Sequence, residues 1–363
     1  MADIRLNKIN KNFGNFKAVI DSDLTINKGE FFVLLGSSGC GKTTSLRMIA
    51  GLEIPDSGEI YLDGKDVTYA RASERDIAFV FQLFALYPHM NVQQNLSFPL
   101  KTQGVPRAEI KQRMLEVAQT LRIDHLLTHP VRGLSGGDRQ RVALGRALIR
   151  RPKAFLMDEP IGTLDAEFRE IMRKELRNLH DRVGATTVYV THDQIEAMSM
   201  GDRIAVMSHG KVLQTGPPME MYNKPRTMFV ADFVGSPSIN FLSFSGAYPA
   251  GTTRVEMNGT PVEIPRLHED LPQAEYVLGA RPEHITLTDR DGLAGTVFVV
   301  EYMGARKLVT VDTDLGRVRV LAGDNHHVSI DDNVQLQFST EFLIIFDKKS
   351  ERAIHSDLMS ESY

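Results

Sequence analysis

The stretch Gly36-Ser37-Ser38-Gly39-Cys40-Gly41-Lys42-Thr43 fits the pattern G-x-x-x-x-G-K-[ST] and decides the fold of the N-terminal part of the chain. Its glycines allow a tight turn in which successive backbone N–H groups converge on phosphate oxygens. Lys42 supplies a cation for the β and γ phosphates, and Thr43 offers a hydroxyl to Mg²⁺. An apolar run over residues 31–35 precedes the loop, and a helix-like run over residues 42–49 follows it. We therefore expect a strand, a phosphate cradle and a helix whose positive N-terminal end attracts the phosphates.

A second motif, an apolar run followed by two acidic residues, occurs later in the chain. Ala154-Phe155-Leu156-Met157-Asp158-Glu159 is an apolar run that ends in two carboxylates. We expect a buried strand that delivers Asp158 to the metal at its C-terminal edge and places Glu159 to polarise an attacking water. Such a run on its own is as often an ordinary strand end. Behind a phosphate-binding loop, however, it is strong evidence for hydrolysis of a nucleoside triphosphate.

Apolar patterning around these two elements predicts a layered α/β domain. Short apolar or alternating runs indicate β-strands, and recurrence at i, i+3 and i+4 indicates helices. Strands are expected at residues 4–9, 18–26, 31–35, 154–157 and 187–190, and helical segments at residues 42–49, 107–127, 168–183 and 194–200. The alternation of strands and helices favours a largely parallel sheet flanked by helices.

The pattern changes near Gly235-Ser236-Pro237. Beyond this point the sequence has short alternating strands, such as residues 317–321 and 334–338, separated by Gly, Pro and Asp. We therefore predict two domains, residues 1–235 and residues 236–363. The second is expected to be a small β-barrel.

Composition limits the function classes that fit the chain. Its 363 residues are 42% hydrophobic and 24% charged, and its formal charge of −4 argues against a dedicated nucleic-acid binder. The single cysteine, Cys40, excludes an internal disulfide and fits a reducing compartment. Residues 1–5 lack the apolar stretch of a signal peptide, and no apolar run approaches the roughly 20 residues that span a bilayer. We expect a cytosolic protein whose role at a membrane comes through a partner.

Further motifs narrow the family. Leu134-Ser135-Gly136-Gly137-Asp138-Arg139-Gln140-Arg141 resembles the signature motif LSGGQ of ABC-type ATPases, and it lies between the two phosphate elements as that family requires. Four more positions are similar to the family's Q-loop, switch histidine, D-loop and adenine-stacking aromatic, and these are Gln82, His192, Leu164-Asp165 and Phe13. The resemblance covers residues 1–235 and implies an α/β P-loop NTPase with a helical subdomain at about residues 88–150.

Other segments point to one branch of this family. Ala85-Leu86-Tyr87-Pro88-His89-Met90, Tyr189-Val190-Thr191-His192-Asp193-Gln194 and Phe233-Val234-Gly235-Ser236-Pro237 resemble carbohydrate-importer ATPases of the maltose and glycerol-phosphate type. Gly279-Ala280-Arg281-Pro282-Glu283-His284 is similar to a part of their C-terminal TOBE domain. The resemblance implies that residues 236–363 form an all-β unit of the oligonucleotide/oligosaccharide-binding type.

The resemblance also implies a role for each motif residue. Glu159 and His192 would be catalytic, and Asp165 would belong to the D-loop. The expected ATP-binding residues are Phe13, Gly36, Ser37, Ser38, Gly39, Cys40, Gly41, Lys42, Thr43, Thr44 and Gln82. The expected ligands of Mg²⁺ are Thr43, Gln82 and Asp158. The signature residues that would contact the ATP held by a second subunit are Leu134, Ser135, Gly136, Gly137 and Asp138.

Such ATPases work as head-to-tail pairs, in which the P-loop of one subunit and the signature of the other enclose each ATP. The expected partners are a second ATPase subunit, two transmembrane permease subunits and an extracytoplasmic solute-binding protein, with no nucleic acid. Residues 83–90 are the expected contact with the permease. The expected location is peripheral, on the cytoplasmic face of the bacterial inner membrane, where the complex would import a sugar, a polyol or a glycerol-phosphate-like solute.

Two departures from the family pattern stand out. Asp138 occupies a position where family members commonly have Gln, and Ile161-Gly162-Thr163 replaces a typical Leu-Ser-Asn. We hypothesise that Asp138 supports the start of its helix and places a negative charge near the partner's phosphate. Because both motifs were expected to face the other subunit, the second ATPase subunit is either identical or a non-identical relative.

Each motif also has an ordinary structural interpretation. Taken alone, Gln82 and His192 are ordinary polar residues, Phe13 is a core residue, and Arg139, Arg141 and Arg146 form a solvated helix face. For the whole chain, the alternatives are a soluble ABC ATPase that acts on nucleic acid or ribosomes, an exporter cassette, and a regulatory role for the C-terminal domain. The ordered set of motifs, the absence of membrane segments and the TOBE-like tail favour the importer.

Overall fold

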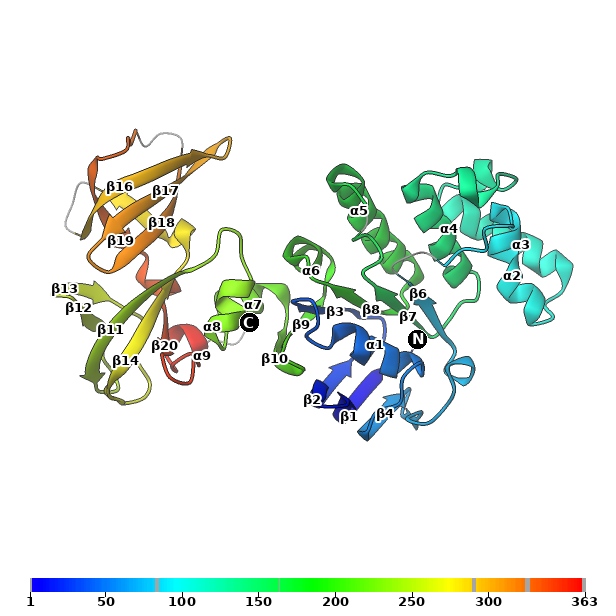
Figure 1. Ribbon diagram of the computed structural model, residues 1–363, viewed down its shortest axis with the longest axis horizontal. Coiled ribbons are helices and arrows are strands. Elements are labelled where there is room, and N and C mark those ends of the chain that lie inside the picture. The colour runs from blue at the N-terminus through cyan, green and yellow to red at the C-terminus, as the bar shows by residue number, and fades with distance from the viewer. Residues whose placement is uncertain (1, 82–84, 163, 289–291, 324–326, 361–363) are drawn as a thin grey trace. The chain divides into compact units, whose positions relative to one another are not determined.

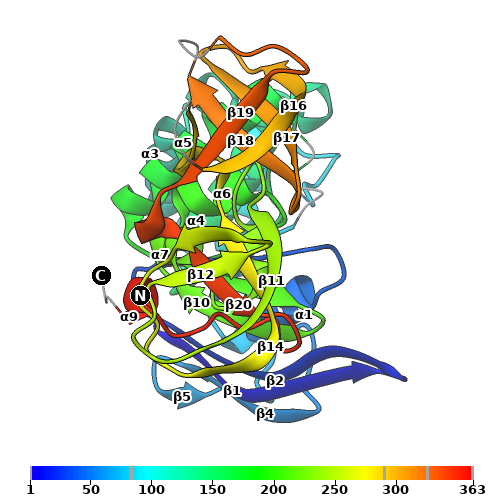
Figure 2. The same ribbon diagram turned by 90° about the vertical axis from the view of Figure 1, so that its left-hand side faces the viewer.

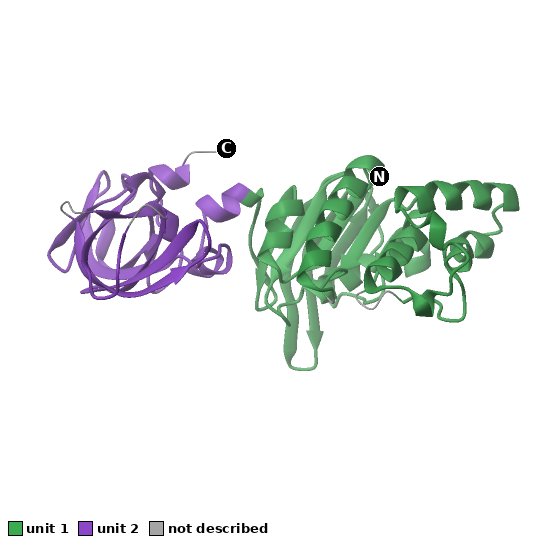
Figure 3. Ribbon diagram, turned by 90° about the horizontal axis from the view of Figure 1, so that it is seen from above, with its two compact units in different colours: residues 1–218 green, residues 219–363 purple. Residues whose placement is uncertain are grey.

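The computed structural model describes residues 2–81, 85–162, 164–288, 292–323 and 327–360. Gln82, Thr163 and the first two residues of the expected permease contact, 83 and 84, fall outside the described residues. The chain divides into two compact units, Met1–Pro218 and Met219–Tyr363 (Figure 3). Each unit has its own hydrophobic core.

A six-stranded sheet forms the centre of the first unit (Figure 1). Its strands run in the order β10 (Lys211–Gly216), β9 (Arg203–Ser208), β3 (Phe31–Gly36), β8 (Thr186–Thr191), β7 (Ala154–Asp158) and β6 (Ile77–Val80). All neighbours pair in parallel except β9 and β10. Every residue of β3 and β8 is buried, as expected for central strands of a parallel sheet covered on both faces. The parallel arrangement brings the carboxyl ends of β3, β7 and β8 to one edge.

Helices α1 (Lys42–Ala50), α5 (Ala166–Val183) and α6 (Gln194–Met200) flank this sheet (Figure 1). A second, antiparallel sheet has the order β2 (Phe16–Ile26), β1 (Ile4–Phe13), β4 (Ser57–Leu62) and β5 (Lys65–Asp66). Apolar residues from both sheets and from α1 join in one core, including Ile4, Leu34, Leu46 and Ile60. The predicted α/β layering is therefore confirmed.

A helical segment lies between β6 and β7 in the sequence. It contains α2 (Val92–Thr102), α3 (Arg107–Thr120) and α4 (Gly136–Leu148), and both α2 and α3 pack against α4. Gly145 permits the close approach of α4 to α2, because a Cβ there would lie 2.7 Å from the Leu96 side chain. The helical run predicted for residues 107–127 ends earlier than expected. Helix α3 stops at Thr120, and Arg122 turns the backbone into the left-handed region with φ 56°.

The second unit is built from antiparallel strands (Figures 1 and 2). One sheet has the order β11 (Asn240–Tyr248), β14 (Leu271–Ala280) and β20 (Ile344–Asp347), and β12 (Arg254–Met257) pairs with β13 (Thr260–Glu263). The largest sheet has the order β15 (Ile285–Thr288), β19 (Asn333–Phe338), β16 (Leu293–Tyr302), β17 (Arg306–Thr313) and β18 (Gly316–Gly323). Short helices α7 (Pro218–Asn223), α8 (Met228–Phe233) and α9 (Asp357–Ser360) complete it.

The second unit begins before the predicted boundary at about residue 235, because the segment that precedes its strands is fastened to it by Arg281. This guanidinium is 2% exposed and donates hydrogen bonds to the carbonyls of Tyr222 at 2.6 Å and Val234 at 2.9 Å. It also lies 3.6 Å from the centre of the Tyr222 ring. Gly235 has φ 129°, and a Cβ there would lie 2.5 Å from Arg281 Nη1. The change of sequence pattern at 235 thus lies shortly before the first strand of the unit, which begins at Asn240, and not at the first residue of the unit.

Candidate functional site

The phosphate-binding loop connects β3 to α1 at the carboxyl edge of the main sheet. Two of its glycines are required by close contacts. A Cβ on Gly36 would lie 2.3 Å from the Met207 carbonyl oxygen, and one on Gly41, whose φ is 107°, would lie 2.3 Å from the Ala18 carbonyl oxygen. The loop is therefore packed tightly between β9 and β2, which fixes the direction of its backbone N–H groups. Ser37, Ser38 and Gly39 form its exposed tip.

Lys42 lies inside the cradle that this loop makes. The side chain is buried, and its ammonium donates to the carbonyl oxygens of Gly36 and Ser37 at 2.8 Å each. A third contact of 3.9 Å reaches the Cys40 sulfur. These bonds hold the cation at the point where the sequence pattern places the β and γ phosphates. Burial raises the pKa of the Cys40 thiol, so this cysteine packs as part of the loop and is not a reactive nucleophile.

Thr43 and Asp158 meet at the start of α1. The Thr43 hydroxyl donates to a carboxylate oxygen of Asp158 at 2.9 Å, although the two residues come from separate motifs. Burial raises the pKa of Asp158, and the charge of Glu159 acts in the same direction, whereas the bond from Thr43 opposes it. A hydroxyl and a carboxylate whose charge is disfavoured fit a small divalent cation, which would supply the missing positive charge.

Glu159 and His192 lie beside this pair. Glu159 follows β7, its N–H donates to the Val190 carbonyl at 3.0 Å, and its backbone has φ 44°. Its carboxylate lies 3.2 Å from His192 Nδ1 at the end of β8. The left-handed backbone costs about 1–3 kcal/mol, and such strain is typical of functional sites. It turns the Glu159 carboxylate toward the histidine, so the two expected catalytic side chains are in contact.

The signature segment begins α4. Ser135 caps this helix by accepting a hydrogen bond from the N–H of Asp138 at 3.1 Å. Gly136 and Gly137 are close to the next predicted motif, because a Cβ on either would lie 3.4 Å from the Leu164 side chain or 3.3 Å from the Phe168 ring. Asp165 caps α5 by accepting from the N–H of Phe168 at 3.0 Å. The signature and the D-loop therefore form one packed surface.

The ABC transporter family matches residues 19–162, and the TOBE domain matches residues 278–346. Across 98% of its length the chain is 44% identical to the trehalose/maltose import ATP-binding protein MalK of Thermococcus litoralis, and it covers 100% of that protein. The chain belongs to the ABC transporter ATP-binding proteins. It is therefore a nucleotide-binding ATPase with a C-terminal TOBE domain, as the sequence motifs predicted.

Other relatives and solved structures agree with this family. The ABC ATPase is 40% identical to the sn-glycerol-3-phosphate import ATP-binding protein UgpC 2 of Agrobacterium fabrum, over 100% of this chain and 97% of that protein. Among solved structures it is similar to cbiO1 of Clostridium perfringens, part of an ABC transporter complex, with a TM-score of 0.58 and 29% identity over 61% of this chain and 90% of that chain. A dimeric bacterial ABC transporter cassette gives a TM-score of 0.54 and 33% identity, over 59% of this chain and 98% of that one.

Three motifs of the ABC ATPase make no polar contact with the P-loop among the described residues, or lie outside those residues. These are the signature, the aromatic residue expected to stack on adenine, and the Q-loop glutamine. Among the described residues, no hydrogen bond or ion pair joins residues 134–138 to residues 36–44. Phe13, at the end of β1, has half of its surface exposed, which excludes the alternative of a core residue. Gln82 lies outside the described residues.

Burial and contacts distinguish the residues of the second departure and of the arginine series. Ile161 is fully buried and Gly162 is exposed, so of the described residues in this departure only Gly162 lies at the surface, where it could face the other subunit. Two of the three arginines have specific partners and are more than a solvated face. Arg141 pairs with Glu175 at 3.2 Å, and Arg146 donates to the Ala85 carbonyl at 2.7 Å.

Two residues behind the site escaped the sequence analysis. Glu196 on α6 is 2% exposed and accepts hydrogen bonds from the hydroxyls of Thr191 at 2.6 Å and Tyr189 at 2.9 Å, immediately behind His192. Arg169 on α5 donates to the Leu164 carbonyl at 3.2 Å and pairs with Asp193 at 3.6 Å. It therefore connects the D-loop to the residue that follows His192. Only their positions near known motifs could have marked them, because their partners are brought together by the fold.

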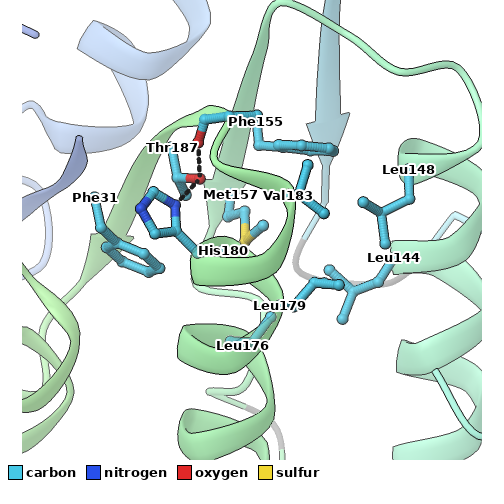
Figure 4. A pocket seen from close by; sticks show the side chains of 11 residues that line it. Phe31, Leu144, Leu148, Phe155, Met157, Leu176, Leu179, His180, Val183 and Thr187 are labelled. Carbon is cyan, nitrogen blue, oxygen red and sulfur yellow. Dashed lines mark hydrogen bonds between the residues drawn. The ribbon is translucent and has the colours of Figure 1, made fainter. Parts of the chain in front are cut away.

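The pocket in Figure 4 is not part of this site. It lies between α4, α5 and the sheet, and its lining is apolar except for His180 and Thr187, whose side chains share a hydrogen bond of 3.0 Å. Burial lowers the pKa of His180, so the ring is neutral and contributes to the core. Within the described part of the ABC ATPase, no helix is both long and apolar enough to cross a membrane.

Proposed function

We propose that this chain is the ATP-hydrolysing subunit that energises a binding-protein-dependent ABC importer for a sugar, polyol or glycerol-phosphate-like solute. The observation that carries the proposal is the convergence at one sheet edge of the buried Lys42 ammonium, the Thr43–Asp158 pair and the Glu159–His192 pair. These are the groups that hold phosphates, bind a divalent cation and act on an attacking water.

In this proposal the N–H groups of residues 36–44 bind the ATP phosphates, and the Lys42 ammonium exchanges its loop carbonyls for phosphate oxygens. Thr43 and Asp158 would hold Mg²⁺, with Gln82 as the third expected ligand, and Phe13 would offer its exposed ring to adenine. The bound ion would supply positive charge that stabilises the negative charge developing on the phosphates. A hydroxyl and one carboxylate fit Mg²⁺, which takes few protein ligands beside phosphates.

Hydrolysis forms a bond from a water oxygen to the γ-phosphorus and breaks the bond to the β-phosphate oxygen, with ADP as the leaving group. Glu159 orients the water and accepts its proton, and His192 contacts the γ-phosphate. The 3.2 Å contact between the two supports these roles, because one histidine nitrogen is held by the carboxylate while the ring remains about half exposed. The strained Glu159 backbone keeps this carboxylate aimed at the site.

The second half of each site comes from another ATPase subunit. Residues 134–138 and Asp165 share one packed surface but have no polar contact, among described residues, with their own P-loop. A head-to-tail pair would bring that surface to the ATP held by the partner. The second subunit is identical or a closely related chain.

The permease is proposed to dock at a groove of about 280 Å³ beside residues 85–90, at the cytoplasmic face of the membrane. Aromatic and basic side chains line it, among them Phe79, Tyr87, Phe98, Arg146 and Arg150. Arg146 lies 5.2 Å from the centre of the Tyr87 ring and also donates to the Ala85 carbonyl. Ala78 and Phe79 of β6 also line this groove.

The solute class is proposed from the relatives. Their names refer to trehalose and maltose, sn-glycerol-3-phosphate, osmoprotective compounds, and xylose and arabinose. These relatives favour an importer over a soluble ATPase that acts on nucleic acid or ribosomes. In this proposal an extracytoplasmic binding protein would select the solute.

The test is reconstitution of the ATPase with its permease in liposomes that contain the binding protein. We expect ATP hydrolysis to rise when the loaded binding protein is added, and Lys42→Ala to abolish the stimulated activity. Stimulation by DNA, RNA or ribosomes in place of the binding protein would overturn the proposal.

A further inference from the structure

We infer that Asp138 is a positioning residue that holds the Ser135 hydroxyl against its own carboxylate, and thereby weakens the contact between this signature helix and the phosphate of the partner's ATP. The inference rests on the proposed function, in which Ser135 faces that phosphate. It concerns a residue that departs from the family's usual Gln.

The Ser135 hydroxyl makes two hydrogen bonds inside its own chain, and one of them uses its only hydrogen. Its oxygen accepts from the N–H of Asp138 at 3.1 Å, and its hydrogen is donated to Asp138 Oδ2 at 2.7 Å. A serine has one hydroxyl hydrogen, and a phosphate oxygen can only accept. Ser135 must therefore break its bond to Asp138 before it can donate to a phosphate. Bonds of this kind to a carboxylate are roughly twice as strong as those between neutral groups.

The helix cap thus differs from a capping box. In that motif the third residue's side chain returns to the backbone N–H of the cap residue. Here the Asp138 carboxylate instead binds the cap's side-chain hydroxyl. Asp138 supports the start of the helix through its backbone N–H. Its carboxylate, however, binds the Ser135 hydroxyl, which is the group expected to contact the phosphate of the partner's ATP.

The negative charge of Asp138 is only partly compensated. Arg141 Nη1 lies 3.5 Å from Asp138 Oδ1, but the same guanidinium contacts Glu175 at 3.2 Å and 3.4 Å. The three side chains sum to one net negative charge. When Ser135 turns toward a phosphate, the released carboxylate oxygen is left facing another anion, which opposes the engagement. A carboxamide at this position would carry no charge and could donate to the phosphate.

A double-mutant cycle in the reconstituted transporter tests this inference, with Asp138→Asn, Ser135→Ala and the double variant. We expect Asp138→Asn to lower the KM for ATP about threefold or more at low salt, and the difference to shrink at high salt. Ser135→Ala should change KM less than about twofold in the wild-type background, because its hydroxyl is already occupied. In the Asp138→Asn background it should raise KM about fivefold, the range of one hydrogen bond.

The loss of the helix cap is the same in both backgrounds and cancels in the cycle, and thermal unfolding of all four proteins checks this. Glu170→Gln is the matched control, because it removes one charge from the exposed, Lys174-paired face of α5 and should leave KM unchanged. Equal effects of Ser135→Ala in the two backgrounds, or an equal shift in Glu170→Gln, overturns the inference. Lys42→Ala distinguishes failure of this inference from failure of the proposed function, since hydrolysis by that variant would overturn the proposed function itself.

Discussion

The backbone conformation at Glu159 favours glycine, whereas the proposed reaction requires a carboxylate at this position. The residue has φ 44°, where a side chain is strained and glycine is not. We predict that Glu159→Gln lowers ATP hydrolysis about 100-fold or more while ATP binding persists, because the amide cannot accept the proton. Glu159→Gly should be as inactive, yet its free energy of unfolding should exceed that of Glu159→Gln by about 1 kcal/mol. Steady-state ATPase assays, calorimetric ATP binding and denaturant unfolding measure the three quantities.

The two variants control for each other, since both remove the carboxylate and its repulsion of Asp158. A glycine variant less stable than the glutamine variant would show that the backbone at this position is not strained. Full activity in Glu159→Gln would remove the residue from the chemistry.

Glu196 gives a prediction about pH. Burial raises the pKa of its carboxyl above 4.5, with Asp193 acting in the same direction and the bonds from Thr191 and Tyr189 opposing it. A carboxyl whose pKa is raised by folding stabilises the fold below its unfolded value, and this contribution is lost as pH rises through the folded value. The wild-type protein should therefore lose stability relative to Glu196→Gln as pH increases above 4.5.

Denaturant unfolding at a series of pH values between acid and neutral measures this difference. Glu167→Gln on α5 is the control, because Glu167 is exposed. A constant stability difference between the wild type and Glu196→Gln across the series would contradict the prediction.

The spacing of residues in the sequence predicted those site residues that lie together in one continuous segment. The P-loop is one continuous segment, so its pattern alone indicated where Lys42 and Thr43 would lie, and the buried strand before Asp158 indicated the carboxylate. Arg169 and Glu196 could not be found this way. Their partners come from different elements, and an arginine or a glutamate on a helix has no distinguishing pattern until the fold brings those elements together.

At the scale of elements, Asn95 fastens residues 87–91 to α2. It is fully buried, its Oδ1 accepts from the N–H of Tyr87 at 2.9 Å, and its Nδ2 donates to the carbonyls of Tyr87, Met90 and Asn91. We predict that Asn95→Ala lowers the free energy of unfolding by about 2 kcal/mol, because these backbone groups lose their partners. It should also reduce the ATPase stimulation that depends on the permease more than it reduces ATP binding.

Thermal unfolding and the liposome assay test both parts. Gln93→Ala changes an exposed residue of the same helix and should leave both measurements unchanged. If permease-dependent ATPase stimulation were normal in Asn95→Ala, residues 87–91 would not be part of the contact with the permease.

The apolar pattern of the sequence predicted the positions of helices and strands where every residue of the segment is buried. Strand β3 lies where the run at residues 31–35 predicted it, because a central strand is apolar throughout. The end of α3 and the start of the second unit were misplaced. The first depends on a left-handed turn at Arg122, and the second depends on the buried Arg281, whose charge resembles that of an exposed residue in the sequence.

For the whole molecule, the account depends on a site that no single chain completes. The family and both folded units could be predicted from the sequence, since the motifs are ordered along one chain. The pairing of P-loop with signature could not be derived from contacts within the chain, and it stays a prediction. Its physical basis is that the signature and the D-loop share one surface, joined through Gly136, Gly137, Leu164 and Phe168.

The most direct measurement of this central claim is ATP hydrolysis by a mixture of two inactive variants. Lys42→Ala removes the P-loop cation, and Gly136→Asp places a carboxylate at the signature. Each variant alone should be inactive. If the sites are composite and the subunits identical, random mixing restores one intact site in each mixed pair, or about a quarter of the wild-type activity. A mixture as inactive as its components, or full activity of Gly136→Asp alone, would contradict the account.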